Sequence, residues 1–460
     1  MSATDTPDQR PIHFVGIAGA GMRALAELLA RRGIPVTGCD AHPGSTDDLQ
    51  ALGISVLKGH SPDHVSNARE LIVTSAMAKN HPELVRAREL GIPITRRAEA
   101  LGRAVAGGRL VGIAGTHGKT TTTVMTTAVL AAAGLKPTGI AGGRVAEWKG
   151  NLRFEGDDLF VVEADEYDRS FLTLSPHVAV VTNIEADHLD VYRDLDDIRS
   201  TFANFARDAG VIVLCDDDAG AKSLDVPPSA EVIRYGLKSR DARLLATNIR
   251  SDGLATAFSV SYDDKDLGEV ALRVPGNHNV QNALAALGTG LSLGLTIESM
   301  REGLLQFQGV DRRFQRLCEV AGIIIVDDYA HHPTEIAATL QAARASYPGR
   351  RIVAAFQPHL FSRTRDFSRE FGVALAAADG VFLTEIYPAR EQPIPGVTAD
   401  LVATSLKEAG RVLAWQGSRT DLAAALNEFV RDGDVVITIG AGDITQTGPE
   451  LKRHLEGRRG

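Results

Sequence analysis

The chain has 460 residues, which exceeds one ordinary hydrophobic core, so we expect two to four domains that are each stable unaided. Its composition, with 44% hydrophobic and 23% charged residues, is typical of soluble globular proteins. A formal net charge of −9 argues against nucleic acid or an anionic membrane as the main partner.

Cys39, Cys215 and Cys318 are far apart in the sequence and outside any C-x-x-C pattern, so they indicate neither a disulfide framework nor a zinc site. The N-terminal residues are polar and acidic, and no apolar run reaches about 18 residues, so we expect neither an export signal nor a membrane span. These features predict a cytoplasmic protein.

Residues 12–40 have the pattern of a βαβ unit, in which a strand, a turn, an amphipathic helix and a second strand follow one another. The turn contains Gly16, Gly19 and Gly21, and the second strand ends at Asp40. The glycines are spaced G-x-x-G-x-G, whereas the dinucleotide fingerprint is G-x-G-x-x-G. An acidic residue about 20 positions after the glycines favours nucleotide binding. A close-packed turn without a ligand is the alternative.

The stretch 110–127 predicts a phosphate-binding loop between a strand and a helix. Gly115, Gly118, Lys119 and Thr120 stand at the junction, where helix N–H groups, an ammonium and a hydroxyl can meet phosphate and Mg²⁺. An isoleucine stands where the strict pattern has its first glycine. The alternative is a tight turn that only caps the helix.

Two further stretches, 159–168 and 178–188, each have a strand followed by polar residues. The carboxyl ends of parallel strands are where ligands collect. Glu163 is a candidate Mg²⁺ ligand, because a cation must separate its carboxylate from a nucleotide phosphate. His188 is either a structural hydrogen-bonding residue or a ligand.

Short alternating strands at 230–273 predict an antiparallel flank. A helix then begins after Pro275, with His278, Asn279 and Asn282 in its first turn and a half. Asn279 and Asn282 are three positions apart and face the same way. Amides at a helix start are as often caps as ligands.

Beyond this helix, strands and helices alternate to the end of the chain, which predicts another doubly wound sheet. The sequence therefore predicts an α/β protein of three domains. They are a Rossmann-like domain at 1–106, a central P-loop ATPase-like domain with a mixed sheet at 107–312, and a C-terminal Rossmann-like domain at 313–460.

Eleven motifs, in order along nearly the whole chain, resemble the Mur ligase family, the ATP-dependent amide-forming enzymes of peptidoglycan assembly. They are HFVGIAGAGM, TSAM with GIPITRRAE, GTHGKTTTT, EADEYDRSFL, TNIEADHLD, GNHNVQNALAA, FQGVDRRF, DDYAHHPTEI, FQPHLFSRTRD, EIYPAREQPIPG and ITIGAGDI. The resemblance is strongest to the branch that adds alanine, on the evidence of FQPHLFSRTRD, QPIPG and the G-x-x-G-x-G opening.

Ala18, Arg23 and Asp311 depart from the residues usual in that branch. No lysine occurs between Lys149 and Lys222, so the carbamoylated lysine of some sister ligases has no candidate there. This agrees with the alanine-adding branch.

The resemblance implies ATP-dependent ligation of L-alanine to the carboxylate of UDP-N-acetylmuramate, in peptidoglycan precursor synthesis for the cell wall. The carboxylate would take the γ-phosphoryl group of ATP to give an acyl phosphate and ADP, and the amine of alanine would then displace phosphate. Both steps depend on the placement of charge. ATP and Mg²⁺ are the expected cofactors, and the expected state is a monomer or homodimer.

The resemblance also implies roles for the residues at matching positions. The catalytic residues would be Lys119, Glu163, His188, Arg313 and Asp328. Lys119 would contact the β- and γ-phosphates. Mg²⁺ would be held by Thr120 and Glu163, with a second ion at His188. Arg313 would reach phosphate, and Asp328 the ribose or a catalytic water.

The substrate sites implied by the resemblance cover all three domains, with the third carrying the amino acid and closing over ATP. ATP would lie at Gly115, Thr116, His117, Gly118, Lys119, Thr120, Thr121, His278, Asn279, Asn282 and Arg313. The UDP-sugar would lie at Gly16, Gly19, Ala20, Gly21, Met22, Asp40, Ser75, Ala76 and Arg97. The amino acid would lie at Tyr329, His331, His359 and Arg363, with the arginine clamping its carboxylate.

Other functions remain open on the sequence. The nearest is a ligase that reattaches a recycled murein peptide to UDP-N-acetylmuramate, followed by folylpolyglutamate synthetase. The βαβ opening also permits a nicotinamide-dependent dehydrogenase, and a nucleotide-binding regulator without catalysis is a further alternative. Nucleotide hydrolysis that depends on the acceptor substrate would distinguish a ligase from the last two.

Overall fold

The computed structural model describes residues 8–75, 77–239 and 241–458. The chain divides into two compact units. The first contains the chain up to Leu245 with Ser261–Leu267 and Gln281–Leu304, and the second contains Ala246–Val260, Gly268–Val280 and the chain from Leu305. None of the helices in the described ranges is long and apolar enough to cross a membrane.

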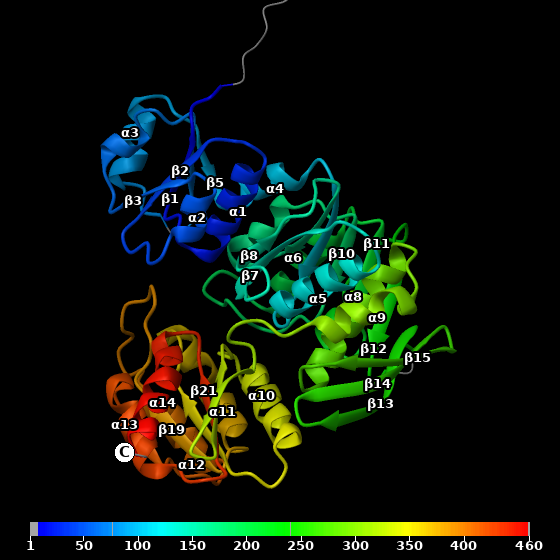
Figure 1. Ribbon diagram of the computed structural model, residues 1–460, viewed down its shortest axis with the longest axis vertical. Coiled ribbons are helices and arrows are strands. Elements are labelled where there is room, and N and C mark those ends of the chain that lie inside the picture. The colour runs from blue at the N-terminus through cyan, green and yellow to red at the C-terminus, as the bar shows by residue number, and fades with distance from the viewer. Residues whose placement is uncertain (1–7, 76, 240, 459–460) are drawn as a thin grey trace, which may run out of the picture. The chain divides into compact units, whose positions relative to one another are not determined.

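The first unit begins with a parallel sheet of five strands and its helices, drawn in blue to cyan in Figure 1. The strands are β1 (Ile12–Val15), β2 (Val36–Asp40), β3 (Ser55–Lys58), β4 (Glu70–Val73) and β5 (Ile94–Arg96), and the helices are α1 (Ala20–Arg31), α2 (Asp47–Ala51), η1 (Pro62–Val65), α3 (Pro82–Glu89) and α4 (Arg97–Val105). The strand order is β3-β2-β1-β4-β5. This confirms the βαβ opening and the Rossmann-like fold.

The two faces of this sheet are covered by different helices. Phe14 of β1 belongs to a buried cluster with Leu25 of α1. Val15, which points to the opposite face because side chains alternate along a strand, clusters with Val65 of η1 and Leu84 of α3. Both faces are therefore apolar and buried, as in other parallel sheets.

A second sheet of ten strands forms the centre of the chain, in the order β15-β14-β13-β12-β11-β10-β6-β9-β7-β8. Its strands are β6 (Arg109–Ala114), β7 (Thr138–Val145), β8 (Gly150–Arg153), β9 (Leu159–Glu163), β10 (Val178–Val181), β11 (Val211–Cys215), β12 (Glu231–Gly236), β13 (Leu244–Asp252), β14 (Ala255–Tyr262) and β15 (Lys265–Leu272). Its helices are α5 (Lys119–Ala132), η2 (Tyr167–Thr173), α6 (Leu195–Ala206), α7 (Ala219–Lys222), α8 (Asn277–Ser292) and α9 (Ile297–Gln306).

The flank predicted to be antiparallel is partly parallel, which corrects the sequence analysis. β12 pairs in parallel with β11, with Val211 opposite Glu231, and in parallel with β13, with Tyr235 opposite Leu244. Parallel neighbours need a crossover connection, and α7 lies in the segment between β11 and β12. An antiparallel pair occurs instead between β7 and β8, so the central sheet is mixed.

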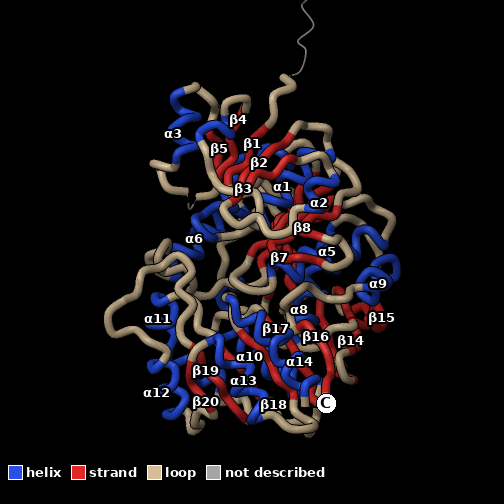
Figure 2. The backbone as a smooth tube through the Cα atoms, turned by 60° about the vertical axis from the view of Figure 1, so that its left-hand side comes forward, coloured by secondary structure: helices blue, strands red, loops and turns tan. Residues whose placement is uncertain are grey.

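The third sheet has six strands in the order β16-β17-β21-β18-β19-β20, and helices lie beside it in Figure 2. The strands are β16 (Gln315–Val320), β17 (Ile323–Asp328), β18 (Ile352–Phe356), β19 (Gly380–Thr384), β20 (Trp415–Gly417) and β21 (Val435–Ile439). The helices are α10 (Pro333–Ser346), α11 (Phe361–Leu375), α12 (Asp400–Glu408), α13 (Arg419–Phe429), η3 (Asp443–Gln446) and α14 (Thr447–Gly457).

Helices cover this sheet on two faces, which confirms the doubly wound fold. Leu340 of α10 and Phe371 of α11 belong to one buried cluster, and Leu426 of α13 and Leu451 of α14 belong to another. Only the edge strand β16 pairs in antiparallel fashion among the described pairs of this sheet. The stretch 363–366 lies inside α11.

Candidate functional site

The predicted phosphate-binding loop lies at the carboxyl end of β6, between two parallel neighbours. Ala114 of β6 pairs with Val181 of β10, and Ile113 pairs with Glu163 of β9. The residues that follow β9 and β10 therefore flank the loop on both sides. Gly118 precedes α5 with a left-handed φ of 81°, a conformation that favours glycine.

Lys119, the first residue of α5, folds back over the loop. Its Nζ donates to the carbonyl oxygens of Gly115 at 2.6 Å and Thr116 at 3.1 Å. The same Nζ lies 2.8 Å from Oε2 of Glu166. Burial alone would lower the pKa of Lys119, but Glu166 and Asp165 outweigh burial and raise it. The ammonium is thus charged and held above the loop.

Thr120 and Glu163 bring two oxygen atoms together beside the loop. The Thr120 hydroxyl donates to Oε1 of Glu163 at 3.0 Å, and the N–H of Gly142 donates to Oε2 at 2.5 Å. A Cβ on Gly142 would lie 2.7 Å from Oε1, so this carboxylate occupies the space that a side chain would need. Burial raises the pKa of Glu163.

His188 lies next to the same buried carboxylate that holds Lys119. Its Nε2 is 3.7 Å from Oε1 of Glu166 and 3.7 Å from Oδ2 of Asp187. Its backbone has a φ of 53°, and its ring meets that of Tyr167 edge to face at 5.2 Å. Burial raises the pKa of Glu166 to about 7.

The loop is fixed from the side of β10. The His117 N–H donates to Oδ1 of Asn183 at 2.7 Å, and the Thr182 hydroxyl donates to the His117 carbonyl at 2.6 Å. The Thr116 N–H donates to the Asn183 carbonyl at 3.1 Å. These bonds hold the loop's backbone in place. Thr121 follows in α5 and is buried.

Asn282 of α8, which the resemblance places at ATP together with the loop residues, packs directly against the loop. It accepts a hydrogen bond from the Thr122 hydroxyl at 3.1 Å. A Cβ on Gly118 would lie 2.6 Å from Oδ1 of Asn282. The amide therefore supports the turn that starts α5.

The glycine turn after β1 is hydrogen-bonded to β2, the strand that pairs with β1. The N–H groups of Gly16 and Ile17 donate to the Cys39 carbonyl at 2.8 and 3.1 Å. Asp40 accepts from the N–H of Ala18 at 3.1 Å and from that of His42 at 2.9 Å. The carboxylate expected at the UDP-sugar thus also holds the turn.

The other residues expected at the UDP-sugar lie around the start of α1. Gly19 caps the helix and Ala20 begins it, while the Met22 side chain is buried in the core. Gly21 faces Arg97, whose Nη1 would lie 3.0 Å from an added Cβ. Ser75 is exposed, and Ala76 lies outside the described residues.

In the second unit, two arginines lie close to the ring of Tyr329. The guanidinium carbons of Arg312 and Arg313 lie 4.8 and 5.0 Å from its ring centroid. Arg312 also donates to the Gly440 carbonyl at 2.7 Å, whereas Arg313 has a long contact of 3.9 Å with Glu335. Arg312 is therefore tied to its own sheet more tightly than Arg313.

Asp328, at the end of β17, is buried and accepts two backbone hydrogen bonds. The N–H groups of Phe314 and Ala330 each donate to it at 2.8 Å. Burial raises its pKa to about 6. It connects the segment before β16 to the end of β17.

Aromatic and basic side chains gather after β17 and β18. His331 lies 5.3 Å from the Tyr329 ring and 6.1 Å from the His359 ring, measured between centroids. Arg363 is buried on α11, and its Nη1 is 3.4 Å from Nδ1 of His359. The structure thus brings together the four residues expected at the amino acid.

His278 and Asn279 lie at the start of α8 in the second unit. The Asn279 side chain donates to the Pro275 carbonyl at 2.7 Å, which is a local helix-start contact. Burial lowers the pKa of His278 to about 4, so its imidazole is neutral. Its ring packs on Gly276.

Glu166 is the residue that the sequence analysis did not assign a role. It touches Lys119 and His188, and the Tyr192 hydroxyl donates to its carbonyl at 2.5 Å. Its position in the sequence could have indicated a role, because Glu166 lies three residues after Glu163, just beyond the end of a strand in a parallel sheet.

Comparison with known proteins covers nearly the whole chain. The Mur ligase family catalytic domain matches residues 11–109, the Mur ligase middle domain matches 113–290, and the Mur ligase glutamate ligase domain matches 312–442. UDP-N-acetylmuramate–L-alanine ligase of Salinibacter ruber is 44% identical over 97% of this chain and 95% of its own length. The enzyme of the same name from Streptomyces avermitilis is 41% identical over 98% of both chains.

Two solved structures extend the comparison to the fold. The UDP-N-acetylmuramate-alanine ligase of Thermotoga maritima has a TM-score of 0.82 and 31% identity, covering 97% of this chain and 99% of that one. A murein peptide ligase from Psychrobacter arcticus has a TM-score of 0.70 and 25% identity, covering 97% and 98%.

Proposed function

Because the chain belongs to the Mur ligase family, we propose that it joins L-alanine to the carboxylate of UDP-N-acetylmuramate, with ATP converted to ADP and phosphate. The step would serve peptidoglycan precursor synthesis in the cytoplasm. The relatives that carry this activity in their names match almost end to end.

The observation that carries the proposal is the arrangement at the phosphate loop. A buried, charged Lys119 lies over the turn, and the oxygens of Thr120 and Glu163 meet beside it. Lys119 would hold the β- and γ-phosphates by charge-assisted hydrogen bonds. The carboxylate of UDP-N-acetylmuramate attacks the γ-phosphorus, and the bond to the β,γ-bridging oxygen breaks to release ADP.

The acyl phosphate then reacts with the neutral amine of L-alanine. The nitrogen attacks the carbonyl carbon, the bond to the phosphate oxygen breaks, and the amine loses a proton as the amide forms. Fixed positive groups stabilise the charge that gathers on the transferring oxygens in the first step. The site must exclude water, because water would hydrolyse the acyl phosphate.

The donor set beside the loop fits Mg²⁺, which prefers hard oxygen ligands. The Thr120 hydroxyl and the Glu163 carboxylate are 3.0 Å apart and stand at the start of α5. Mg²⁺ held there would neutralise charge on the phosphate oxygens. We assign His188 to a second Mg²⁺, and Oε1 of Glu166, 3.7 Å from its Nε2, would supply the oxygen such an ion prefers.

For the second unit, we assign Arg313 to phosphate, Asp328 to the ribose or a water, and the cluster of Tyr329, His331, His359 and Arg363 to the amino acid. Arg363 is buried, and its planar guanidinium suits bidentate contact with a carboxylate. His278 and Asn279 remain assigned to the nucleotide. The turn at Gly16 to Met22, with Asp40, Ser75, Ala76 and Arg97, remains assigned to the UDP-sugar.

An assay of phosphate release tests the proposal. The protein is given ATP, Mg²⁺ and UDP-N-acetylmuramate, and then L-alanine, L-serine, glycine or the murein tripeptide in separate reactions. We expect the highest kcat/KM with L-alanine, with one ADP and one amide formed per phosphate. Preference for the tripeptide would instead support the function named for the Psychrobacter arcticus relative. ADP formation that does not require UDP-N-acetylmuramate would contradict both.

A further inference from the structure

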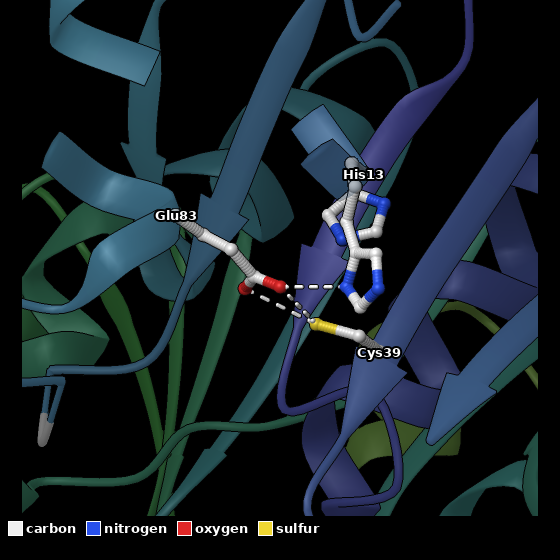
Figure 3. Close-up of side chains that lie close together, drawn as sticks. His13, Cys39 and Glu83 are labelled. Carbon is white, nitrogen blue, oxygen red and sulfur yellow. Dashed lines mark hydrogen bonds and ion pairs between the residues drawn. The ribbon is translucent and has the colours of Figure 1, made fainter. Parts of the chain in front are cut away.

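A group of metal-binding side chains lies in the N-terminal sheet, away from the phosphate loop. His13 of β1, Cys39 of β2, His64 of η1 and Glu83 of α3 each offer one ligand atom, and these four atoms lie within 4.8 Å of one another. Figure 3 shows His13, Cys39 and Glu83 turned toward a common point. We propose that these four side chains bind a structural Zn²⁺.

The contacts within the group centre on Glu83. The Cys39 thiol donates to Oε1 and Oε2 of Glu83 at 3.1 and 3.2 Å. Nδ1 of His64 lies 2.8 Å from Oε1. The chain brings the residues together because β1 and β2 are adjacent strands, and η1 and α3 both pack on the face where Val15 and Cys39 lie.

Among the described residues, the negative charge of Glu83 has no ion-pair partner that is always positively charged. Its side chain is fully buried. Within residues 8–75, 77–239 and 241–458, its ion-pair partners are His60, His64 and His81, and each is charged only when protonated. A buried carboxylate without a cation is costly. A divalent ion with one thiolate and one carboxylate would leave the group neutral.

His13 has a nitrogen placed for a ligand. Its Nδ1 contacts the Thr37 hydroxyl at 2.9 Å, whereas its buried Nε2 has no hydrogen-bond partner among the described residues. In a metal-bound histidine, a hydrogen bond to the ring nitrogen that does not bind the metal fixes the orientation of the ring. A histidine binds a metal through a nitrogen that carries no proton.

The types of ligand atom indicate which metal ion the site binds. A thiolate and imidazoles favour Zn²⁺ over Mg²⁺ or Ca²⁺, and four protein ligands without an open position are typical of a structural site. Ligand atoms in a tetrahedral zinc site are about 3 to 4 Å apart, so small side-chain rotations suffice. Cysteine spacing alone predicted no zinc site, because these ligands are scattered over 70 positions from His13 to Glu83.

Zinc here would stabilise the UDP-sugar turn indirectly. The Cys39 carbonyl accepts the N–H groups of Gly16 and Ile17. Fixing the Cys39 side chain therefore fixes the backbone to which the turn is bonded. Cys39 is a positioning residue in this account.

The test uses the full chain, stripped with a chelator, desalted, and loaded with Zn²⁺ or Co²⁺. We expect one tightly held zinc per chain by mass spectrometry, and a near-ultraviolet thiolate-to-cobalt band in the Co²⁺ form. Cys39→Ser keeps a hydroxyl for Glu83 but should lose the band. His454→Gln, at an exposed position of α14, is the matched control and should keep it.

Three results would overturn the proposal: no zinc retained after desalting, a cobalt band unchanged in Cys39→Ser, or a band lost in His454→Gln. A measurement on the unmutated chain does not depend on whether the variants fold. Amide hydrogen exchange is therefore compared with and without zinc. Zinc should slow exchange in β1, β2 and α3, and equal exchange with and without zinc would also count against the site.

Discussion

The ammonium of Lys119 lies 2.8 Å from Oε2 of Glu166, and both side chains are largely buried. The lysine expected to hold ATP phosphates is thus already neutralised by a carboxylate from the segment after β9. If the loop holds ATP as proposed, phosphate binding competes with this ion pair, and we expect Glu166 to set how strongly the loop holds a nucleotide.

Replacing Glu166 with Gln should lower the stability of the nucleotide-free protein and strengthen nucleotide binding. The change leaves the Lys119 ammonium buried without its counter-charge, which should cost about 3 kcal/mol of stability without nucleotide. ATP would then find the ammonium unopposed, so ATP added without Mg²⁺ should raise the melting temperature of the variant more than that of the unmutated protein. Equal nucleotide-induced shifts would contradict the competition, and Glu147→Gln, at an exposed position, is the control.

Lys119→Ala should remove most turnover. Loss of a charge-assisted contact to the transferring phosphoryl group should reduce kcat/KM for ATP by about a thousandfold, or about 4 kcal/mol. Lys136→Ala removes an exposed lysine just beyond α5 and should leave the rate unchanged. Near-normal turnover of Lys119→Ala would mean that the loop does not hold the reacting phosphates.

Glu163→Gln should change the Mg²⁺ requirement while preserving the fold, because the amide oxygen can still accept from Thr120 or Gly142. The Mg²⁺ concentration for half-maximal ADP formation should rise by about tenfold or more, since a neutral oxygen is a weaker ligand. Thr120→Ser keeps the hydroxyl and should retain the normal requirement. An unchanged Mg²⁺ titration in Glu163→Gln would place the ion elsewhere.

Asp328 should make stability depend on pH. Burial raises its pKa from 3.8 to about 6, so the folded state binds its proton more tightly than the unfolded state. Stability from this group is therefore full below about pH 4 and falls by about 3 kcal/mol as pH rises through 6. Urea unfolding of Asp328→Asn should lack this fall between pH 4 and 7, although the variant is less stable overall. Parallel pH profiles would contradict the assignment.

The sequence was sufficient to predict those elements whose characteristic residues lie close together in the chain. The strand, glycine turn and helix around Lys119 were predictable because one short stretch carries the glycines, the lysine and the hydroxyl together. The parallel pairing of β12 was not, because strand direction depends on where a crossover such as α7 packs.

Contacts made in three dimensions were the least predictable. The Lys119–Glu166 pair joins residues 47 positions apart, and Asn282 reaches Thr122 across 160 positions. No spacing rule covers either contact. The His13, Cys39, His64 and Glu83 group has the same origin, because adjacent parallel strands and two helices bring its members to one face of a sheet.

The central claim is that the carboxylate oxygen of UDP-N-acetylmuramate is itself phosphorylated. Substrate labelled with oxygen-18 in that carboxylate tests this directly, by mass spectrometry of the inorganic phosphate released with L-alanine present. We expect one labelled oxygen in each phosphate formed, because the bond broken by the amine joins the carbonyl carbon to that oxygen. Phosphate without the label, formed alongside a normal yield of amide, would contradict the acyl phosphate.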